Sequence, residues 1–230
     1  MTKRPDSLEI LSDETLGAPG FLTLRRLRVR HVYSDGSASP EYNCDVSSRR
    51  STDAVGVVLW FREKGGQVMV VLKEGVRPPI WLRRTKELIQ DGPGAPLLMI
   101  ELVAGILEPS DKGEGGLQRR AAAESREEAG VDLPESSFSP LGTATFPSPG
   151  ASDECVFLME AELNGAPPKD GSLTKGDGSP MEHGTQVLVM EMNEALARCR
   201  DGGIPNMLAE LGLGRLKEKL DAEGELQTRG

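Results

Sequence analysis

The chain has 230 residues, which suits one large domain, or one domain with an added N-terminal element, and allows a sizeable core. Its net charge of -9 argues against a general nucleic-acid binder, which would present a basic face. No stretch approaches the roughly 20 apolar residues of a membrane-spanning helix, and three scattered cysteines with two histidines argue against a zinc site or a disulfide framework. We expect no nucleic-acid or membrane partner and, since the first residues lack the apolar core of a signal peptide, a cytoplasmic protein.

Residues 1–50 are predicted to form a tail and a strand region. Residues 1–20 are polar and are expected to be loose. Residues 21–33 alternate apolar and basic side chains, a pattern typical of a strand with one buried face, and residues 42–50 offer a return strand. An apolar alternating hairpin of this kind would be a liability if it were left exposed.

Residues 51–222 are predicted to form one mixed domain. Buried strands or apolar segments are expected at 54–61, 68–72, 97–103, 138–146, 155–159 and 185–190. Helices are expected at 117–129, 193–200 and 206–220, with Gly130 ending the first and Gly212 or Gly214 as candidate breaks in the last. This order predicts an α/β (α+β) sandwich rather than a doubly wound sheet, followed by a flexible tail at 223–230.

Three glutamates on the first predicted helix are the most informative residues. Glu124, Glu127 and Glu128 have the spacing i, i+3 and i+4, which places their carboxylates on one helix face. Such close like charges repel, and Mg²⁺, which prefers carboxylate oxygens, water and phosphate, would relieve the repulsion. Cations held there could neutralise a diphosphate and activate a water. The simpler alternative is a solvated acidic helix face.

The surrounding residues 105–131, GILEPSDKGEGGLQRRAAAESREEAGV, resemble the Nudix box. The resemblance implies a loop–helix–loop in which Glu124, Glu127 and Glu128 bind Mg²⁺ or Mn²⁺, with Glu127 and Glu128 also catalytic. Three departures concern Ala123, where the family has an Arg that holds the glutamates, Ser125, where it has an aliphatic residue, and an early Glu that is out of register. Gly115 stands at the expected spacing of that Glu, with Glu114 one residue off. The candidates to replace the missing Arg are Arg119, Arg120 and Arg126.

Two segments before the box resemble the ADP-ribose and sugar-nucleotide pyrophosphatase branch of this family. Residues 101–105, ELVAG, resemble its Glu-x-Pro-Ala-Gly segment, which implies a metal-binding carbonyl at Ala104 and a substrate contact at Glu101. Residues 71–79, VLKEGVRPP, resemble its strand ending in Gln-Tyr-Arg-Pro, which implies a substrate contact at Arg77. A surface charge at a strand end is the alternative interpretation of Arg77.

Two later segments extend the resemblance. Residues 148–154 match the Ser-Pro-Gly-x-x-x-Glu element, whose glutamate, here Glu154, lies near the active site of the branch, and we add Arg50 to the substrate-binding set. Residues 181–184 resemble the loop before the last strand, which commonly supplies the general base. Glu182 is the candidate, because a carboxylate near metal-bound water can take its proton, and His183 is the runner-up. A loop glutamate with no role is the alternative.

Together these matches span residues 54–220 and imply an α/β/α sandwich around a mixed sheet. They imply a homodimer whose N-terminal strands cross to the partner, a role suited to residues 21–50. The implied activity is Mg²⁺-dependent hydrolysis of a nucleoside diphosphate sugar, with ADP-ribose cleaved to AMP and ribose 5-phosphate as the first candidate. The alternatives are a UDP- or GDP-sugar substrate, and a degenerate domain that senses a nucleotide sugar. Candidates for stacking on the base are Trp60, Trp81, Phe61 and Tyr42, of which Trp60 is better suited to a core.

Overall fold

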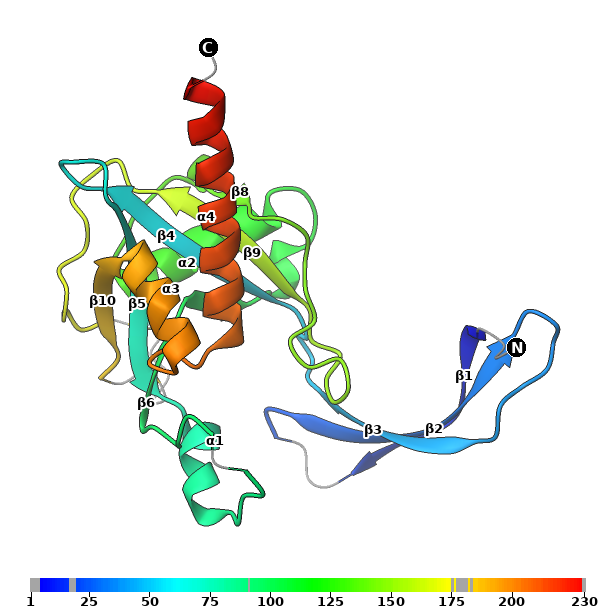
Figure 1. Cartoon of the computed structure of the whole chain (residues 1–230). Helices are drawn as coiled ribbons and strands as arrows, with labels where there is room; N and C mark the ends of the chain where they lie inside the picture. The colour runs from blue at the N-terminus through cyan, green and yellow to red at the C-terminus, as the bar shows by residue number, and fades with distance from the viewer. Residues whose placement is uncertain are drawn as a thin grey trace. The chain divides into compact units, whose positions relative to one another are not determined.

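The chain divides into two units in a computed structural model that describes residues 5–16, 20–90, 92–174, 176, 182 and 184–228. Unit 1 contains residues 1–52 and 146–155, and unit 2 contains residues 53–145 and 156–230 (Figure 1). The sequence placed a boundary at residue 50 but did not assign residues 146–155 to the N-terminal part. Backbone pairing joins these distant segments, because the Ser47 amide donates to the Ala151 carbonyl at 2.8 Å.

Unit 1 is built on an antiparallel sheet of the order β1-β2-β3. Its strands are β1 (Pro5–Leu16), β2 (Thr23–Tyr33) and β3 (Tyr42–Ser48). The expectation of a loose segment at residues 1–20 was therefore wrong over β1. The register sets Glu9 opposite Arg30 and Glu14 opposite Arg26.

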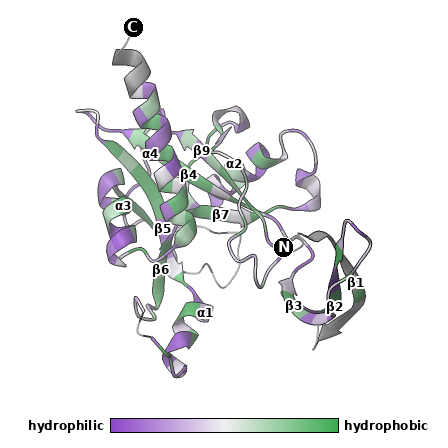
Figure 2. Ribbon diagram, turned by 45° about the vertical axis from the view of Figure 1, so that its right-hand side comes forward, coloured by the Kyte–Doolittle hydropathy of each residue, from purple (hydrophilic) through white to green (hydrophobic). Residues whose placement is uncertain are grey.

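Unit 2 contains a mixed sheet of the order β10-β5-β4-β9-β8, with β6 paired to β5 and β7 paired to β4. Its strands are β4 (Ala54–Arg62), β5 (Val68–Val76), β6 (Leu98–Glu101), β7 (Val103–Ile106), β8 (Ser139–Pro140), β9 (Val156–Glu162) and β10 (Gln186–Glu191). β4 is central and is buried along most of its length, as its continuous apolar sequence predicts. Figure 2 shows β4 and β5 largely in the hydrophobic colour.

Helices cover both faces of this sheet. They are α2 (Gly116–Ala129) on one face and α3 (Met192–Asp201) and α4 (Met207–Thr228) on the other. The short α1 (Pro78–Trp81) belongs to neither core cluster, and 3-10 turns lie at Leu82–Thr85, Pro109–Asp111 and Glu135–Ser137. One core cluster joins Val58 and Leu72 of the sheet to α3 and α4, and the other joins Val57 and Val71 to α2 (Figure 1). The predicted α/β/α sandwich around a mixed sheet is confirmed.

Three predicted elements have different limits in the structure. The strand expected at 97–103 is split into β6 and β7 at Leu102, and the segment at 138–146 forms only the short β8. α4 runs unbroken past Gly212 and Gly214, and it continues to Thr228 through part of the expected tail. A Cβ on Gly212 would lie 2.9 Å from Leu102 Cδ1, so this glycine allows the helix to approach the sheet closely rather than breaking it.

The limits of α2 were predicted closely. The helix begins after Gly115, with φ of 73°, and ends at Gly130, with φ of 67°, and both are left-handed conformations that glycine tolerates. A Cβ on Gly116 would lie 1.6 Å from the Asp111 carbonyl oxygen, so only glycine fits between the preceding loop and the helix. Within the described ranges, no helix has the length and apolar character needed to cross a bilayer.

Candidate active site

The glutamates of α2 face the sheet. Glu124 is 8% exposed and Glu128 is 3% exposed, and they share the buried helix face with Ala121 and Ala129. Glu127 is half-buried. A solvated acidic helix face would leave all three carboxylates in water, so burial contradicts that alternative for Glu124 and Glu128.

Both carboxylate oxygens of Glu128 are engaged by unit 2. The Ala104 amide donates to its Oε2 at 2.9 Å, and the Lys73 ammonium donates to its Oε1. Lys73 lies on β5 and is only 5% exposed. The sequence analysis did not single out Lys73, although a lysine directly after the apolar run Val68–Leu72 was a signal that could have found it.

Glu124 lies directly against the backbone of β7. A Cβ on Gly105 would fall 1.7 Å from Glu124 Oε1, so the glycine leaves the space that the carboxylate fills. Arg120 Nη1 lies 3.5 Å from the same oxygen, and Arg120 Nε donates to Asp111 Oδ2 at 2.9 Å. The loop and the helix are thus joined through one guanidinium.

Arg120 is the candidate replacement that reaches a helix glutamate. Arg119 instead donates to the carbonyls of Glu114 and Ser110, and Arg126 is exposed, 4.0 Å from Asp132. Glu114 is itself exposed and precedes the helix, so the carboxylate that pairs with the arginine comes from Asp111. The sequence analysis did not identify Asp111.

The two buried glutamates lack full charge compensation. Burial raises the pKa of Glu124 to about 7, against the opposing charge of Arg120, and the nearby Glu127 raises it further. Burial also raises the pKa of Glu128 to about 7, although Lys73 and the Ala104 amide favour its ionised form. Carboxylates in this state gain from an additional cation.

The donor chemistry of this group suits a hard divalent cation, with Glu124, Glu127, Glu128 and the Ala104 carbonyl as the residues that would hold it. In the part of the chain that the structure describes, no three acidic, His or Cys side chains already surround a position for a metal ion. One oxygen of Glu128 contacts Lys73, and one oxygen of Glu124 lies near Arg120.

Gly176 and Glu182 lie near the C-terminal end of α2. The Gly176 amide donates to the Glu127 carbonyl at 3.0 Å, and a Cβ on Gly176 would lie 2.3 Å from Glu182 Oε2. These contacts bring Glu182 to the end of the helix that carries Glu127 and Glu128. His183, the runner-up for the same role, lies outside the described residues.

Arg77 and Glu101 are brought together at the ends of β5 and β6. Arg77 Nε donates to Glu101 Oε2 at 2.5 Å, and Asn206 Nδ2 lies 3.3 Å from Glu101 Oε1. Asn206, which the sequence analysis did not identify, also caps α4 by accepting from the Ala209 amide at 2.9 Å. The carboxylate of Glu101 is thus fixed from two sides.

Comparison with solved structures identifies the architecture. A structure described as an ADP compounds hydrolase matches 97% of this chain and 99% of its own, with a TM-score of 0.61 and 14% sequence identity. The chain has a Nudix fold. At this identity the likeness concerns the fold and not the activity.

Two further structures match the Nudix fold of this chain less well. A MutT/nudix family protein from Enterococcus faecalis matches 66% of this chain and 46% of its own, with 15% identity and a TM-score of 0.39. An Ap4A hydrolase from C. elegans matches 74% of this chain and 98% of its own, with 12% identity and a TM-score of 0.41. No protein-family model and no curated protein matches the sequence.

The remaining predicted site residues, Glu154 and Arg50, belong to unit 1 and not to the layered Nudix unit. Glu154 Oε1 accepts from Arg49 Nη2 at 2.6 Å, whereas Arg50 is exposed. Arg49 also donates to the carbonyls of Ser51 and Thr52, which folds its guanidinium onto this segment. Within unit 1, Glu154 therefore pairs with Arg49 rather than with Arg50.

The aromatic candidates separate into buried and exposed residues. Trp60 is 4% exposed and donates to Glu160 Oε2 at 2.6 Å, and Phe61 is 7% exposed in the core. Neither can stack on a nucleotide base, and the core assignment of Trp60 is confirmed. Trp81 and Tyr42 have exposed rings, 40% and 41%.

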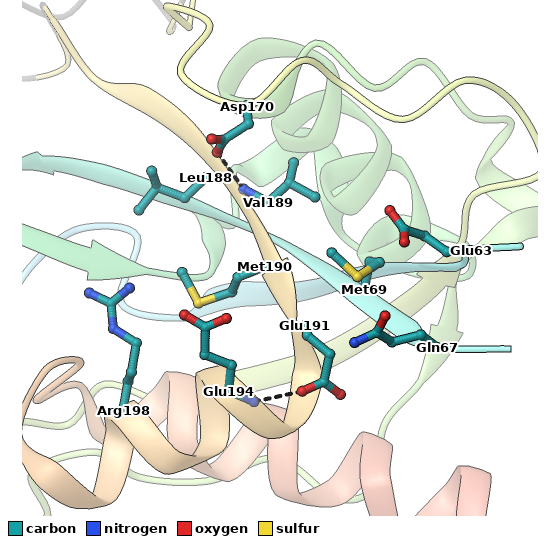
Figure 3. A pocket seen from close by; sticks show the side chains of 10 residues that line it. All are labelled: Glu63, Gln67, Met69, Asp170, Leu188, Val189, Met190, Glu191, Glu194 and Arg198. Atoms are coloured by element: carbon teal, nitrogen blue, oxygen red, sulfur yellow. Dashed lines mark hydrogen bonds between the residues drawn. The ribbon is translucent and has the colours of Figure 1, made fainter. Parts of the chain in front are cut away.

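A separate hollow lies along β10 of the Nudix fold. Its lining residues are Glu63, Gln67, Met69, Asp170, Leu188, Val189, Met190, Glu191, Glu194 and Arg198 (Figure 3). Asp170 accepts from the Val189 amide at 2.9 Å, and Glu191 accepts from the Glu194 amide at 2.8 Å. Both carboxylates therefore accept hydrogen bonds from backbone amides. None of the predicted site residues lines the hollow.

Proposed function

We propose that this chain is a Mg²⁺-dependent hydrolase of the diphosphate bond in a nucleoside diphosphate sugar, with ADP-ribose as the first candidate. The observation that carries the proposal is the burial of Glu124 and Glu128 against the Ala104–Gly105 backbone, with both pKa values raised to about 7. Buried carboxylates on one helix face are suited to a hard cation. The fold match supports the proposal, because that protein is described as acting on ADP compounds.

The three glutamates of α2 act together in this proposal. Glu124, Glu127 and Glu128 hold the cation, together with the Ala104 carbonyl, and Mn²⁺ is an alternative to Mg²⁺. When bound, the ion supplies charge neutralisation at the diphosphate and lowers the pKa of a water. The Ala104 amide fixes Oε2 of Glu128, and the Gly105 backbone sets the position of the Glu124 carboxylate.

The substrate is positioned by residues at the strand ends. The Arg77 guanidinium, held by Glu101, is suited to a phosphate oxygen or a sugar hydroxyl. Asn206 fixes the other oxygen of Glu101 and so keeps the pair in one orientation. Arg50 and Glu154 of unit 1 are assigned to substrate contacts as well. A UDP- or GDP-sugar is the alternative substrate within this class.

In the proposed reaction, a water oxygen attacks one phosphorus atom and the bond from that phosphorus to the bridging oxygen breaks. Glu182 accepts the proton of the attacking water. With ADP-ribose the products are AMP and ribose 5-phosphate. The approach of the Glu182 segment to Glu127 supports this role, and His183 is the alternative base.

We also propose that the chain forms a homodimer through unit 1. Among the described side chains of this unit, Val29 alone is a fully buried hydrophobic residue, while Phe21, Leu22 and Leu24 are exposed at 69%, 53% and 44%. A small sheet without a core of its own needs an apolar cover for stability. A second copy of the chain would supply it.

The decisive test is release of phosphate monoester from ADP-ribose, UDP-glucose, GDP-mannose and NADH in the presence of Mg²⁺, with and without EDTA. Cleavage of one substrate that EDTA and Glu128→Gln both abolish would support the proposal. The second candidate is a nucleotide-sugar sensor, which the engagement of Glu128 by Lys73 favours. Saturable binding of one compound without cleavage would support that function instead.

A further inference from the structure

Lys73 places a fixed positive charge at the centre of the candidate active site. Its side chain is 6% exposed, that of Glu128 is 4% exposed, and the ammonium contacts Glu128 Oε1. The Ala104 amide holds the other oxygen at 2.9 Å. A buried lysine is costly to desolvate, and it is retained only where a partner compensates its charge.

The direction of the Lys73 side chain follows from its position in β5, where successive side chains point to opposite faces of the sheet. Val70 and Leu72 belong to the core on the α3–α4 side, whereas Val71 belongs to the core beneath α2, with Met69 packed against it. Residue 73 continues the second set, so its side chain emerges under α2. An apolar residue there would continue the core, but Glu128 would then keep the Ala104 amide and lose the ammonium.

We propose that the Lys73 ammonium is a built-in cation of this site, which occupies the Glu128 oxygen that a divalent cation would use, so that the metal binds in competition with Lys73. This inference rests on the proposed metal-binding role of Glu128. It makes Lys73 a positioning residue that sets the affinity of the site for metal.

Competition follows from the charges and the geometry. In a confined, buried site, an ammonium and a divalent cation at the same carboxylate oxygen repel each other, so each weakens the binding of the other. Removing the ammonium leaves an uncompensated carboxylate that attracts a divalent ion more strongly. Replacing it by another fixed cation keeps the competitor in place.

The test is titration of the full-length chain with Mn²⁺, followed by electron paramagnetic resonance of the free ion at about pH 8, where Glu128 is ionised. Lys73→Met is expected to lower the dissociation constant for Mn²⁺ by about tenfold or more, and Lys73→Arg is expected to leave it within about threefold of the unmodified chain. Lys73→Gln provides a second neutral side chain if the methionine variant does not fold.

Lys219→Met is the matched control. Lys219 also pairs with a buried glutamate, because its Nζ lies 2.6 Å from Glu160 Oε1, but this pair joins α4 to β9 on the other face of the sheet. Its loss is expected to leave Mn²⁺ affinity unchanged. A general loosening of the fold would instead change the Mn²⁺ affinity of both Lys73→Met and Lys219→Met.

The outcomes separate this inference from the proposed function. Tighter Mn²⁺ binding in Lys73→Met that Glu128→Gln abolishes supports the competition. Equal or weaker binding in Lys73→Met than in the unmodified chain overturns it, while the metal site itself stands. If neither the unmodified chain nor any Lys73 variant binds Mn²⁺, the proposed metal site fails, and the inference fails with it.

Discussion

Arg120 Nε donates to Asp111 Oδ2 at 2.9 Å and joins the turn before α2 to the first part of that helix. The same guanidinium lies 3.0 Å from Glu108 Oε2 and 3.5 Å from Glu124 Oε1. Arg120 precedes Ala123 by three residues, so the two positions share a helix face. The arginine that the Nudix box resemblance leads us to expect at Ala123 is thus available from one turn earlier.

This arrangement predicts that Arg120→Met impairs both stability and hydrolysis. Asp111 and Glu124 would lose a buried cation, which is expected to lower the free energy of unfolding by about 1–3 kcal/mol and kcat/KM by about tenfold or more. Urea denaturation and initial rates on the substrate found in the panel would measure the two effects. Arg126→Met, at an exposed position, is the control. Equal losses of unfolding free energy and of kcat/KM in the two variants would contradict the role of Arg120.

The sequence could predict features that depend on residues close together in the chain. The limits of α2 follow from a run of helix formers between two glycines, and the grouping of Glu124, Glu127 and Glu128 follows from helical spacing. The partners of these glutamates depend on tertiary contacts, as the separation of 55 positions between Lys73 and Glu128 illustrates. No local pattern specifies such a contact.

The same distinction explains the errors in the fold. β1 was missed because its polar sequence becomes a strand only by pairing with β2. α4 continues past its glycines because Gly212 meets Leu102 and Val58 of the sheet, and because Lys217–Asp221 pairing supports its exposed side.

Glu128→Gln is expected to abolish hydrolysis and to destabilise the metal-free fold. Glutamine still accepts from the Ala104 amide, but it leaves the Lys73 ammonium buried without a charge partner, a loss of about 3–5 kcal/mol. The double variant Lys73→Met with Glu128→Gln is expected to regain much of the stability without regaining activity. Denaturation of the two single variants and the double variant gives the coupling energy, and additive losses would show that the pair does not interact.

The stability of the metal-free chain is expected to depend on pH through Glu124 and Glu128. Their pKa values rise from 4.5 to about 7 on folding, mainly by burial, so the folded chain holds more protons than the unfolded chain between these values. Their contribution therefore decreases as the pH rises through this interval, by about 3 kcal/mol for each group.

Urea denaturation in EDTA at several pH values between about 5 and 8 would measure this decrease. Glu124→Gln is expected to flatten the slope, because one of the two groups is removed, and Mn²⁺ at the upper pH is expected to restore stability. A slope that is unchanged in Glu124→Gln would show that another group causes the pH dependence.

Arg77→Met is expected to weaken substrate binding more than the chemical step. Its guanidinium is held by Glu101 at the strand ends and does not contact Glu128, so KM should rise about tenfold or more while kcat changes less. Steady-state kinetics would separate the two. Lys86→Met, an exposed basic residue on the segment that follows α1, is the control. A fall in kcat alone would remove Arg77 from the substrate-binding set.

Lysine at both Leu22 and Leu24 is expected to convert a dimer into a monomer. Both side chains are exposed, at 53% and 44%, so the double substitution removes little packing within one copy but places two charges in a contact between copies. Light scattering coupled to size exclusion would measure the mass, with Ser34→Lys in the exposed turn as the control. Since unit 2 contains the glutamates of α2, Mn²⁺ binding should persist in the monomer. A dimer that survives the double substitution would place the contact on another surface.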